Sequence, residues 1–220
     1  MITIPEIQDI IMSNNPHSYY HIYKQYEQSY WKHIPNWILE HCRNNNIKNC
    51  IDLGIAYGTL GLYTKLFTNC NVYGIDFVKY ISDDLVNKYN INYQLKNIEL
   101  EEFNYDTKFE IVLFTEVFEH LNFNPIKTMQ KINSILSDNG KVFFSTPDSA
   151  SKWGKINIYQ TYKEMPEPNS NIEIKDAHIY QYNIDELKKI FNLSGFKIDK
   201  LDYSESGKNL RHFNIQLSKR

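Results

Sequence analysis

The sequence predicts an α/β fold built on one doubly wound, mostly parallel sheet. From residue 49 onward, short apolar runs alternate with amphipathic segments, as strands do when crossover helices join them. The run at 109–115 is apolar apart from Glu110 and the terminal Thr115, and such a run is typical of a central strand covered on both faces. Residues 1–48 instead carry apolar residues at helical spacing, so we expect a helical cap before the sheet.

The size and composition of the chain predict a single domain over residues 1–220. Of the 220 residues, 42% are hydrophobic and 23% are charged, which is ordinary for a soluble globular protein. No apolar stretch is long enough to cross a bilayer, and the N-terminus lacks the basic region of a secretory signal. The three cysteines show no C-x-x-C spacing. We therefore expect a cytoplasmic protein without membrane insertion.

Three helices are expected in the cap, residues 1–48. Isoleucines recur at helical spacing over residues 4–11, and the sequence Asn-Asn-Pro at 14–16 interrupts the pattern. A second helix fits residues 18–31. A third fits 35–42, because proline is tolerated in a first helical turn.

Five strands and three helices are expected between residues 49 and 147. The last of these helices starts at Asn124 and Pro125, since asparagine caps helices and proline fits the first helical position. It should end before the turn sequence Asp-Asn-Gly at 138–140. The expected strands are 49–55, 71–76, 91–97, 109–115 and 141–147, and the expected helices are 58–67, 79–88 and 125–136.

The alternation stops at residues 148–182, which we interpret as a substrate-loop insertion. Asn183 and Glu186 then form a capping-box pattern for a helix that ends near Leu193, and Gly195 suits the position after it. The remaining segments predict a closing hairpin with an antiparallel last strand. Its two strands are expected at 196–204 and 211–219.

The strongest motif is IDLGIAYGTLG at residues 51–61. It places Asp52 at the end of the first strand and Gly54 and Gly58 in the turn before a helix. Glycine permits the backbone angles of a tight turn and lets a ligand approach the backbone. Asp76 ends the second strand, where a carboxylate can accept hydrogen bonds from both hydroxyls of a ribose. Together these residues predict a nucleotide-type ligand at the carboxyl ends of the strands.

The segment DLGIAYG resembles the D-x-G-x-G-x-G signature of class I S-adenosylmethionine-dependent methyltransferases, within a small-molecule O-methyltransferase-like group. The resemblance continues through VYGID, FEIVLFTEVFEHL, ILSDNGKVFFSTPDS and HIYQYNIDELKKIFNLSGF, and it covers roughly residues 45–220. It implies a Rossmann-like sheet of seven strands. One departure is Ala56 in place of the middle glycine, which narrows the space beside the ligand.

The resemblance also implies a set of residues that bind S-adenosylmethionine. Asp52 would lie near the methionine amino group, Asp76 would hold the ribose, and Thr115 with Glu116 would lie beneath the sulfonium. Asn97 would offer its amide oxygen beside the adenine. The full set is Asp52, Gly54, Ala56, Gly58, Asp76, Phe77, Asn97, Ile98, Thr115 and Glu116.

The catalytic group must remove a proton from the acceptor, because the cofactor already carries a reactive methyl group. We expect His120 or His178 in this role, and a structural role for His212 on the last strand. Glu116, Glu119 and His120 would share one helical face and, with His178, could bind a divalent metal ion. This pattern is similar to small-RNA 2′-O-methyltransferases and ubiquinone-biosynthesis O-methyltransferases. The same EHL sequence also resembles a common metal-free variant, so a metal is not favoured.

The aromatic residues of the second helix leave two interpretations open. His17, Tyr19, Tyr20, Tyr23 and Tyr26 could cover the cofactor, because N-terminal helices often form a lid in the family that the chain resembles. The 17 tyrosines can equally reflect AT-rich codon usage, since isoleucine, asparagine and lysine are also abundant. Exposed apolar residues on the same helices could instead form a homodimer interface.

The function expected from the sequence is methyl transfer from S-adenosylmethionine to a hydroxyl of a small molecule, such as a sugar, a metabolite or a surface-polysaccharide building block. The net charge of −2 disfavours a nucleic-acid partner. Three alternatives stay open: a metal-dependent RNA 2′-O-methyltransferase, a nicotinamide-dependent oxidoreductase and a non-catalytic cofactor-binding module. The oxidoreductase fingerprint G-x-G-x-x-G would require glycine at positions 54, 56 and 59, where the chain has Gly, Ala and Thr.

Overall fold

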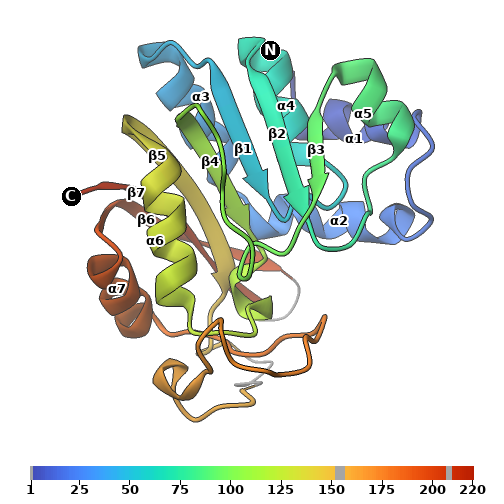
Figure 1. Ribbon diagram of the computed structural model, residues 1–220. Helices are drawn as coiled ribbons and strands as arrows, with labels where there is room; N and C mark the ends of the chain where they lie inside the picture. The colour runs from blue at the N-terminus through green and yellow to red at the C-terminus, as the bar shows by residue number, and fades with distance from the viewer. Residues whose placement is uncertain (1, 152–156, 207–209) are drawn as a thin grey trace.

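A seven-stranded sheet forms the centre of the molecule, and helices cover both of its faces (Figure 1). The computed structural model describes residues 2–151, 157–206 and 210–220. The helices are α1 (Ile4–Met12), α2 (Tyr20–Tyr30), α3 (Ile34–Asn44), α4 (Thr59–Thr68), α5 (Asp83–Tyr89), α6 (Pro125–Ile135) and α7 (Ile184–Leu193), with short 3-10 helices η1 (Phe118–His120) and η2 (Tyr162–Glu164). The strands are β1 (Asn49–Leu53), β2 (Asn71–Asp76), β3 (Asn92–Leu95), β4 (Phe109–Thr115), β5 (Leu136–Pro147), β6 (Phe196–Ser206) and β7 (Leu210–Lys219).

The strand order is β3-β2-β1-β4-β5-β7-β6, with β7 antiparallel to both of its neighbours. The predicted α/β class and the antiparallel last strand are therefore confirmed. From β1 the chain proceeds outward to β2 and β3, and then returns to add β4 on the other side. This reversal creates a crevice at the carboxyl ends of β1 and β4, which is where open parallel sheets bind ligands.

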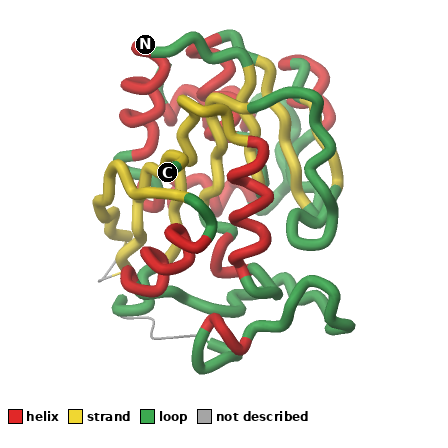
Figure 2. Tube along the Cα trace, turned by 60° about the vertical axis from the view of Figure 1, so that its left-hand side comes forward, coloured by secondary structure: helices red, strands yellow, loops and turns green. Residues whose placement is uncertain are grey.

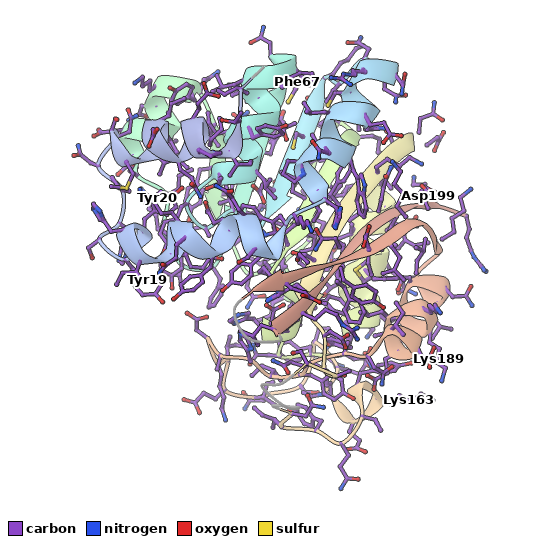
Figure 3. The ribbon with its side chains drawn as sticks, turned by 180° about the vertical axis from the view of Figure 1, so that it is seen from behind. Tyr19, Tyr20, Phe67, Lys163, Lys189 and Asp199 are labelled. Carbon is purple, nitrogen blue, oxygen red and sulfur yellow. The ribbon has the colours of Figure 1, made fainter. Side chains whose placement is uncertain are left out.

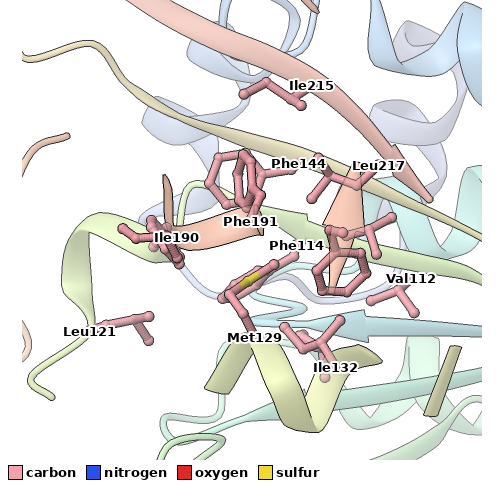
Figure 4. Packing of buried hydrophobic residues seen from close by; sticks show 14 of the residues in the cluster. Val112, Phe114, Leu121, Met129, Ile132, Phe144, Ile190, Phe191, Ile215 and Leu217 are labelled. Carbon is pink, nitrogen blue, oxygen red and sulfur yellow. The ribbon is translucent and has the colours of Figure 1, made fainter. Parts of the chain in front are cut away.

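Alternate residues of β4 belong to two different apolar cores. Ile111 and Leu113 pack with α1, α3, α4 and α5 on one face, whereas Val112 and Phe114 pack with α6 and α7 on the other. Figure 4 shows the second core, where Phe144 and Met129 lie close to Phe114. A fully buried phenylalanine stabilises the fold by roughly 1.5–3 kcal/mol relative to an exposed one. A strand covered on both faces is what the apolar run predicted.

The predicted helix signals are present at the start of α6 and at both ends of α7. The Asn124 side chain accepts a hydrogen bond from the Ile126 N–H, and Pro125 occupies the first helical position. Asn183 and Glu186 form the reciprocal capping box. Gly195 follows α7 with a φ of 80°, a left-handed conformation that favours glycine.

Three local expectations were wrong. β5 begins at Leu136, directly after α6, because Leu136 pairs with Phe109 before a register shift in β4; the expected turn at 138–140 lies within this strand. α5 begins only at Asp83, because the Ser82 hydroxyl accepts the Leu85 N–H and caps the helix there. Residues 118–120 form a 3-10 helix rather than an α-helix.

The described part of the insertion, residues 148–151 and 157–182, lies below the carboxyl ends of the strands as a mainly irregular segment (Figure 2), and residues 152–156 of the predicted insertion lie outside the described residues. The Glu119 carbonyl accepts hydrogen bonds from the N–H groups of Ile179 and Tyr180. The Asn122 side chain exchanges hydrogen bonds with the Lys175 backbone. These contacts fix the end of the insertion against the loop after β4. Among the described residues, no helix combines the length and apolarity that a membrane span requires.

Candidate functional site

A cavity of about 310 Å³ opens at the carboxyl ends of β1, β2 and β4. Its walls come from the loops after these strands, from α2 and from the insertion. The volume lies within the range that small-molecule sites occupy. Four tyrosines and Phe77 contribute aromatic surface, and four acidic residues contribute carboxylates, whereas Lys96 is the one lysine among the described lining residues.

The turn after β1 holds three residues in left-handed conformations. Gly54, Ala56 and Gly58 have φ values of 78°, 46° and 89°. A side chain at Gly54 would collide with Val117, because its Cβ would lie 2.2 Å from Cγ2 of that residue. Ala56 adopts a conformation that costs an L-residue roughly 1–2 kcal/mol, and its N–H donates to Oδ2 of Asp76 at 2.9 Å. Gly54 and Ala56 line the cavity.

Asp76 lies at the end of β2, buried against the turn after β1. Its Oδ2 accepts the Ala56 N–H, and its Oδ1 accepts the Val78 N–H at 3.3 Å. Burial raises the pKa of this carboxyl group. Each oxygen has a second lone pair, so the side chain can also accept hydrogen bonds from a ligand in the cavity, which it lines together with Phe77.

Asn97 and Ile98 line the cavity beyond β3, as expected. The Asn97 amide oxygen, however, accepts hydrogen bonds from the N–H groups of Glu99 and Leu100 at 2.8 and 3.3 Å. Both of its lone pairs are thereby engaged in the local turn. The expectation that this oxygen faces a ligand is not met, and the Nδ2 group is the part of the side chain left to do so.

Asp52 and Thr115 do not line the main cavity. They border a smaller space of about 40 Å³, here named the inner cavity, which shares Gly54 and Glu116 with the main one. Oδ2 of Asp52 accepts the Gly61 N–H at 3.1 Å, and burial raises the pKa of Asp52 to about 7. Gly58 borders neither space and precedes α4 instead.

Glu116 follows β4 with a φ of 53° and directs its side chain toward β7. Its Oε2 lies 2.9 Å from Nδ1 of His212, and both side chains are more than nine-tenths buried. Burial disfavours a charged imidazole, but the Glu116 carboxylate outweighs it and raises the pKa of His212. The other oxygen, Oε1, is buried without a hydrogen-bond partner among the described residues. His212, expected to be structural, therefore contacts a site residue directly.

His120 and His178 come together although 58 positions separate them in the sequence. Their ring centroids lie 4.7 Å apart. Burial, and next the neighbouring His178, lower the pKa of His120 to about 4. Burial likewise lowers the pKa of His178. His120 lines the main cavity beside Asp176, with 3.7 Å between its Nδ1 and the nearer carboxylate oxygen, whereas His178 lies behind it.

Three of the four candidate metal ligands converge. Glu119, His120 and His178 can each offer one ligand atom within 4.8 Å of the others. Glu116 pairs with His212 instead, because the loop after β4 lacks the α-helical spacing assumed for the set. Glu119 accepts a hydrogen bond from the Thr146 hydroxyl, and burial raises the pKa of its carboxyl group.

Aromatic side chains from α2 and from two loops form one wall of the cavity. Tyr23 lines it from α2 and Tyr19 from the position directly before this helix, and Tyr57 and Tyr80, which the sequence motifs did not indicate, extend the wall from two loops. Figure 3 labels Tyr20, the first residue of α2, and Tyr19, which directly precedes this helix. Tyr20 is fully buried below the wall. Tyr57 had a signal in the sequence, since it lies within the glycine turn. The remaining residues of the predicted aromatic set, His17 and Tyr26, are not among the lining residues.

A cavity at the β1/β4 crevice, with a glycine turn and an acid after β2, defines a nucleotide-type binding site on an α/β sheet. The family model that matches this chain is described as a methyltransferase domain and spans residues 23–201. The protein belongs to this family of methyltransferases. Among proteins of curated function, none matches the sequence significantly.

Solved methyltransferases share the fold at low sequence identity. An S-adenosylmethionine-dependent methyltransferase from Clostridium acetobutylicum has a TM-score of 0.65 and 13% identity, over 92% of this chain and 99% of that one. A 1,6-didemethyltoxoflavin-N1-methyltransferase from Burkholderia thailandensis, with bound 1,6-didemethyltoxoflavin and S-adenosylhomocysteine, has a TM-score of 0.64 and 13% sequence identity, over 100% of this chain and 91% of that one. The O-methyltransferase of a Brevibacillus brevis polyketide synthase, in complex with S-adenosylhomocysteine, has a TM-score of 0.62 and 13% sequence identity, over 84% of this chain and 71% of that one.

Proposed function

We propose that the protein transfers the methyl group of S-adenosylmethionine to a hydroxyl of a small molecule. This acceptor would be a sugar or another metabolite, such as a building block of a surface polysaccharide. Membership of a methyltransferase family supports the reaction. The solved neighbours with bound S-adenosylmethionine or S-adenosylhomocysteine support the methyl donor.

The residues of the cavity suit this cofactor. Asp76 retains lone pairs for the two ribose hydroxyls, and Phe77 with Ile98 offers apolar surface to an adenine. The buried Oε1 of Glu116 lacks a partner among the described residues and suits a positively charged group. Each of these roles belongs to a side chain that the sequence also singles out, which is why we assign the cofactor to this cavity.

The acceptor would occupy the part of the cavity between the aromatic wall and the insertion. Tyr57 and Tyr80 border this space on one side, and Ile174 with Asp176 borders it on the other. Aromatic faces beside a carboxylate suit a ring that carries hydroxyl groups, because the ring can stack while its hydroxyls donate hydrogen bonds. A space of this size supports a small acceptor rather than a polymer.

The observation that carries the acceptor chemistry is the position of His120. When bound, S-adenosylmethionine supplies an already electrophilic methyl group. The protein must then orient the hydroxyl and accept its proton. With a pKa of about 4, the His120 imidazole is uncharged at neutral pH, so one of its ring nitrogens can accept a proton, and the residue lines the cavity. The hydroxyl becomes strongly acidic as its oxygen bonds to carbon, so even a weak base can take the proton, and His178 holds the imidazole in place.

The first experiment is thermal unfolding with S-adenosylhomocysteine, with NADH in parallel. At one hundred times Kd, a ligand stabilises a protein by about 2.7 kcal/mol. For a chain of 220 residues this corresponds to a rise in Tm of roughly 5–11 °C. A rise with NADH alone would overturn the methyltransferase assignment for this site.

The second experiment measures turnover on a panel of acceptors that contains sugars, phenols, amines and an RNA oligonucleotide. We expect S-adenosylhomocysteine to form with hydroxyl acceptors, and His120→Ala to abolish most turnover while S-adenosylhomocysteine still binds. His21→Ala, which changes an exposed histidine of α2, is the matched control. Methylation of amines alone would refute the hydroxyl assignment, and full activity of His120→Ala would refute the base.

A metal-assisted form of the same reaction is the second candidate, favoured by the convergence of Glu119, His120 and His178. These residues would hold Mg²⁺, Mn²⁺ or Zn²⁺, which would lower the pKa of the acceptor hydroxyl. Against it stands the Glu119 carboxyl group, since its raised pKa and its hydrogen bond from Thr146 favour an uncharged, already engaged side chain. Loss of turnover in EDTA and its recovery with one of these ions would support the metal form.

A further inference from the structure

Two residues that line the inner cavity each have a buried polar atom without a hydrogen-bond partner in the described parts of the chain. The two atoms are Oε1 of Glu116, a carboxylate acceptor, and Nε1 of Trp31, an indole donor. Buried polar atoms in native proteins are nearly always paired, so two unpaired atoms around one space indicate groups kept for a ligand. Neither atom has a role in the chemistry assigned to His120.

The charges around the inner cavity are all of one sign. Its lining contains Glu27, Asp52 and Glu116 and, among the described residues, no lysine, arginine or histidine. Glu27 already accepts hydrogen bonds from Gln8, Tyr20 and Thr59. Asp52 accepts the Gly61 N–H with Oδ2. Of the three carboxylates, Glu116 is the one with a buried oxygen that lacks a hydrogen-bond partner among the described residues, so it is the one we assign to a cation. A carboxylate of the ligand must rely on an uncharged donor such as the Trp31 N–H.

One face of β7 holds both groups in place. His212 and Asn214 are two residues apart and thus point to the same side of the sheet. His212 binds Oε2 of Glu116 and leaves Oε1 free. Asn214 donates to the Tyr30 carbonyl at 2.9 Å and accepts the His33 N–H at 3.1 Å, which fixes the backbone on both sides of Trp31.

We propose that Glu116 and Trp31 bind the two charged groups at the amino-acid end of S-adenosylmethionine. The ammonium group donates a hydrogen bond to Oε1 of Glu116, and the carboxylate accepts one from Nε1 of Trp31. His212 and Asn214 act as positioning residues for this pair. The inference rests on the proposed methyl donor. It adds a recognition of the amino acid that uses an indole in place of a basic side chain, and it makes the residue after α2 part of the cofactor site.

The test compares two ligands by isothermal titration calorimetry. S-adenosylhomocysteine carries the amino acid, whereas 5′-methylthioadenosine has the same adenosine and thioether without it. Hydrogen bonds to charged groups are strong enough that losing one weakens binding about 10- to 100-fold. We expect Trp31→Phe and Glu116→Gln each to weaken S-adenosylhomocysteine by about this factor and to leave 5′-methylthioadenosine within about twofold. Unchanged 5′-methylthioadenosine binding also shows that each variant is folded.

The controls separate this inference from the proposed function. Trp37→Phe changes a tryptophan that stacks on His33 outside both cavities, and it should leave both affinities unchanged. His212→Ala should weaken S-adenosylhomocysteine alone, and His212→Asn should restore it, because the Asn amide nitrogen can replace Nδ1.

Three outcomes would overturn the inference. In two of them the wild-type protein binds S-adenosylhomocysteine, and the proposed methyl donor stands. In the first, Trp31→Phe and Glu116→Gln lower the affinity for both ligands equally. In the second, the wild-type protein binds S-adenosylhomocysteine no more tightly than 5′-methylthioadenosine. In the third, the wild-type protein binds neither ligand, and the proposed methyl donor fails as well.

Discussion

Glu27 offers a quantitative test of how α2 is attached to the cofactor-binding turn. Its carboxylate lies fully buried between α1, α2 and α4 and accepts hydrogen bonds from Gln8 at 2.8 Å, Thr59 at 2.7 Å and Tyr20 at 3.2 Å. Burial raises the pKa of Glu27 from its usual 4.5 to about 7, and the three hydrogen bonds oppose this rise only in part. The folded protein therefore favours the protonated side chain.

The size and direction of the effect on stability follow from this pKa. The contribution of Glu27 to the free energy of unfolding is most favourable below pH 4.5, where its side chain is protonated in both states, and it decreases as the pH rises to about 7, above which it is constant. The decrease from this one group amounts to about 3 kcal/mol. Glu27→Gln removes the titration and keeps the hydrogen bonds, since its amide oxygen can accept from Gln8 and Tyr20 while its NH₂ group donates to the Thr59 hydroxyl.

We expect Glu27→Gln to match the wild-type protein near pH 4.5 and to be more stable by about 3 kcal/mol at pH 8. At about 2–4 °C per kcal/mol, this corresponds to a Tm higher by about 6–12 °C. The assay is thermal unfolding of both proteins between pH 4.5 and 8.5. Glu40→Gln, which changes an exposed glutamate paired with Lys200, is the control and should follow the wild-type curve.

Two results would refute the reasoning about Glu27. A difference in Tm that is the same at every pH would show that Glu27 does not titrate between 4.5 and 7. A variant less stable than the wild type at pH 8 would show that the three hydrogen bonds require a charged carboxylate, which outweighs the cost of burying it.

Three further perturbations test the site. Asp76→Asn should weaken S-adenosylhomocysteine binding about 10- to 100-fold in calorimetry, because its ribose hydrogen bonds lose their charge; unchanged affinity would place the ribose elsewhere. His120→Ala should lower kcat about 10²- to 10⁴-fold at constant Kd for S-adenosylhomocysteine, as loss of a general base does, and a parallel fall in affinity would indicate a binding role instead. His178→Ala should lower kcat less than His120→Ala, since His178 is not among the residues that line the cavity. If both variants lower kcat equally in the presence of Mg²⁺, Mn²⁺ or Zn²⁺, the result would favour the shared metal site.

The sequence predicts the strands and the cofactor turn well because their signals are local. An apolar run such as 111–114 indicates a strand buried on both faces, and the glycine positions of the turn after β1 adopt left-handed angles within a few residues. The left-handed conformation of Ala56 shows that the turn tolerates a residue the motif would not choose. Its N–H bond to Asp76 is one interaction that stabilises this conformation.

Contacts between distant segments could not be predicted in the same way. Glu116 and His212 meet because β7 inserts antiparallel beside β5, which brings His212 opposite Pro147 at the carboxyl end of the sheet. Local sequence patterns give no measure of that register, and helical spacing alone predicts that Glu116 and Glu119 share one face. The 3-10 geometry of residues 118–120 and the left-handed Glu116 separate the two side chains.

The two ends of the chain meet at the site, and this gives the N-terminal cap a function beyond covering the sheet. Tyr23 of α2 lines both cavities, and Trp31 follows the same helix. Asn214 and Ser204 of the closing hairpin bind the Tyr30 carbonyl and its surroundings, so the hairpin holds the end of α2 while Glu27 holds its middle against Thr59. A helix fixed at two points presents its tyrosines at constant positions. For that reason, changes at Glu27 or Asn214 should alter cofactor affinity although neither side chain would touch the adenosine.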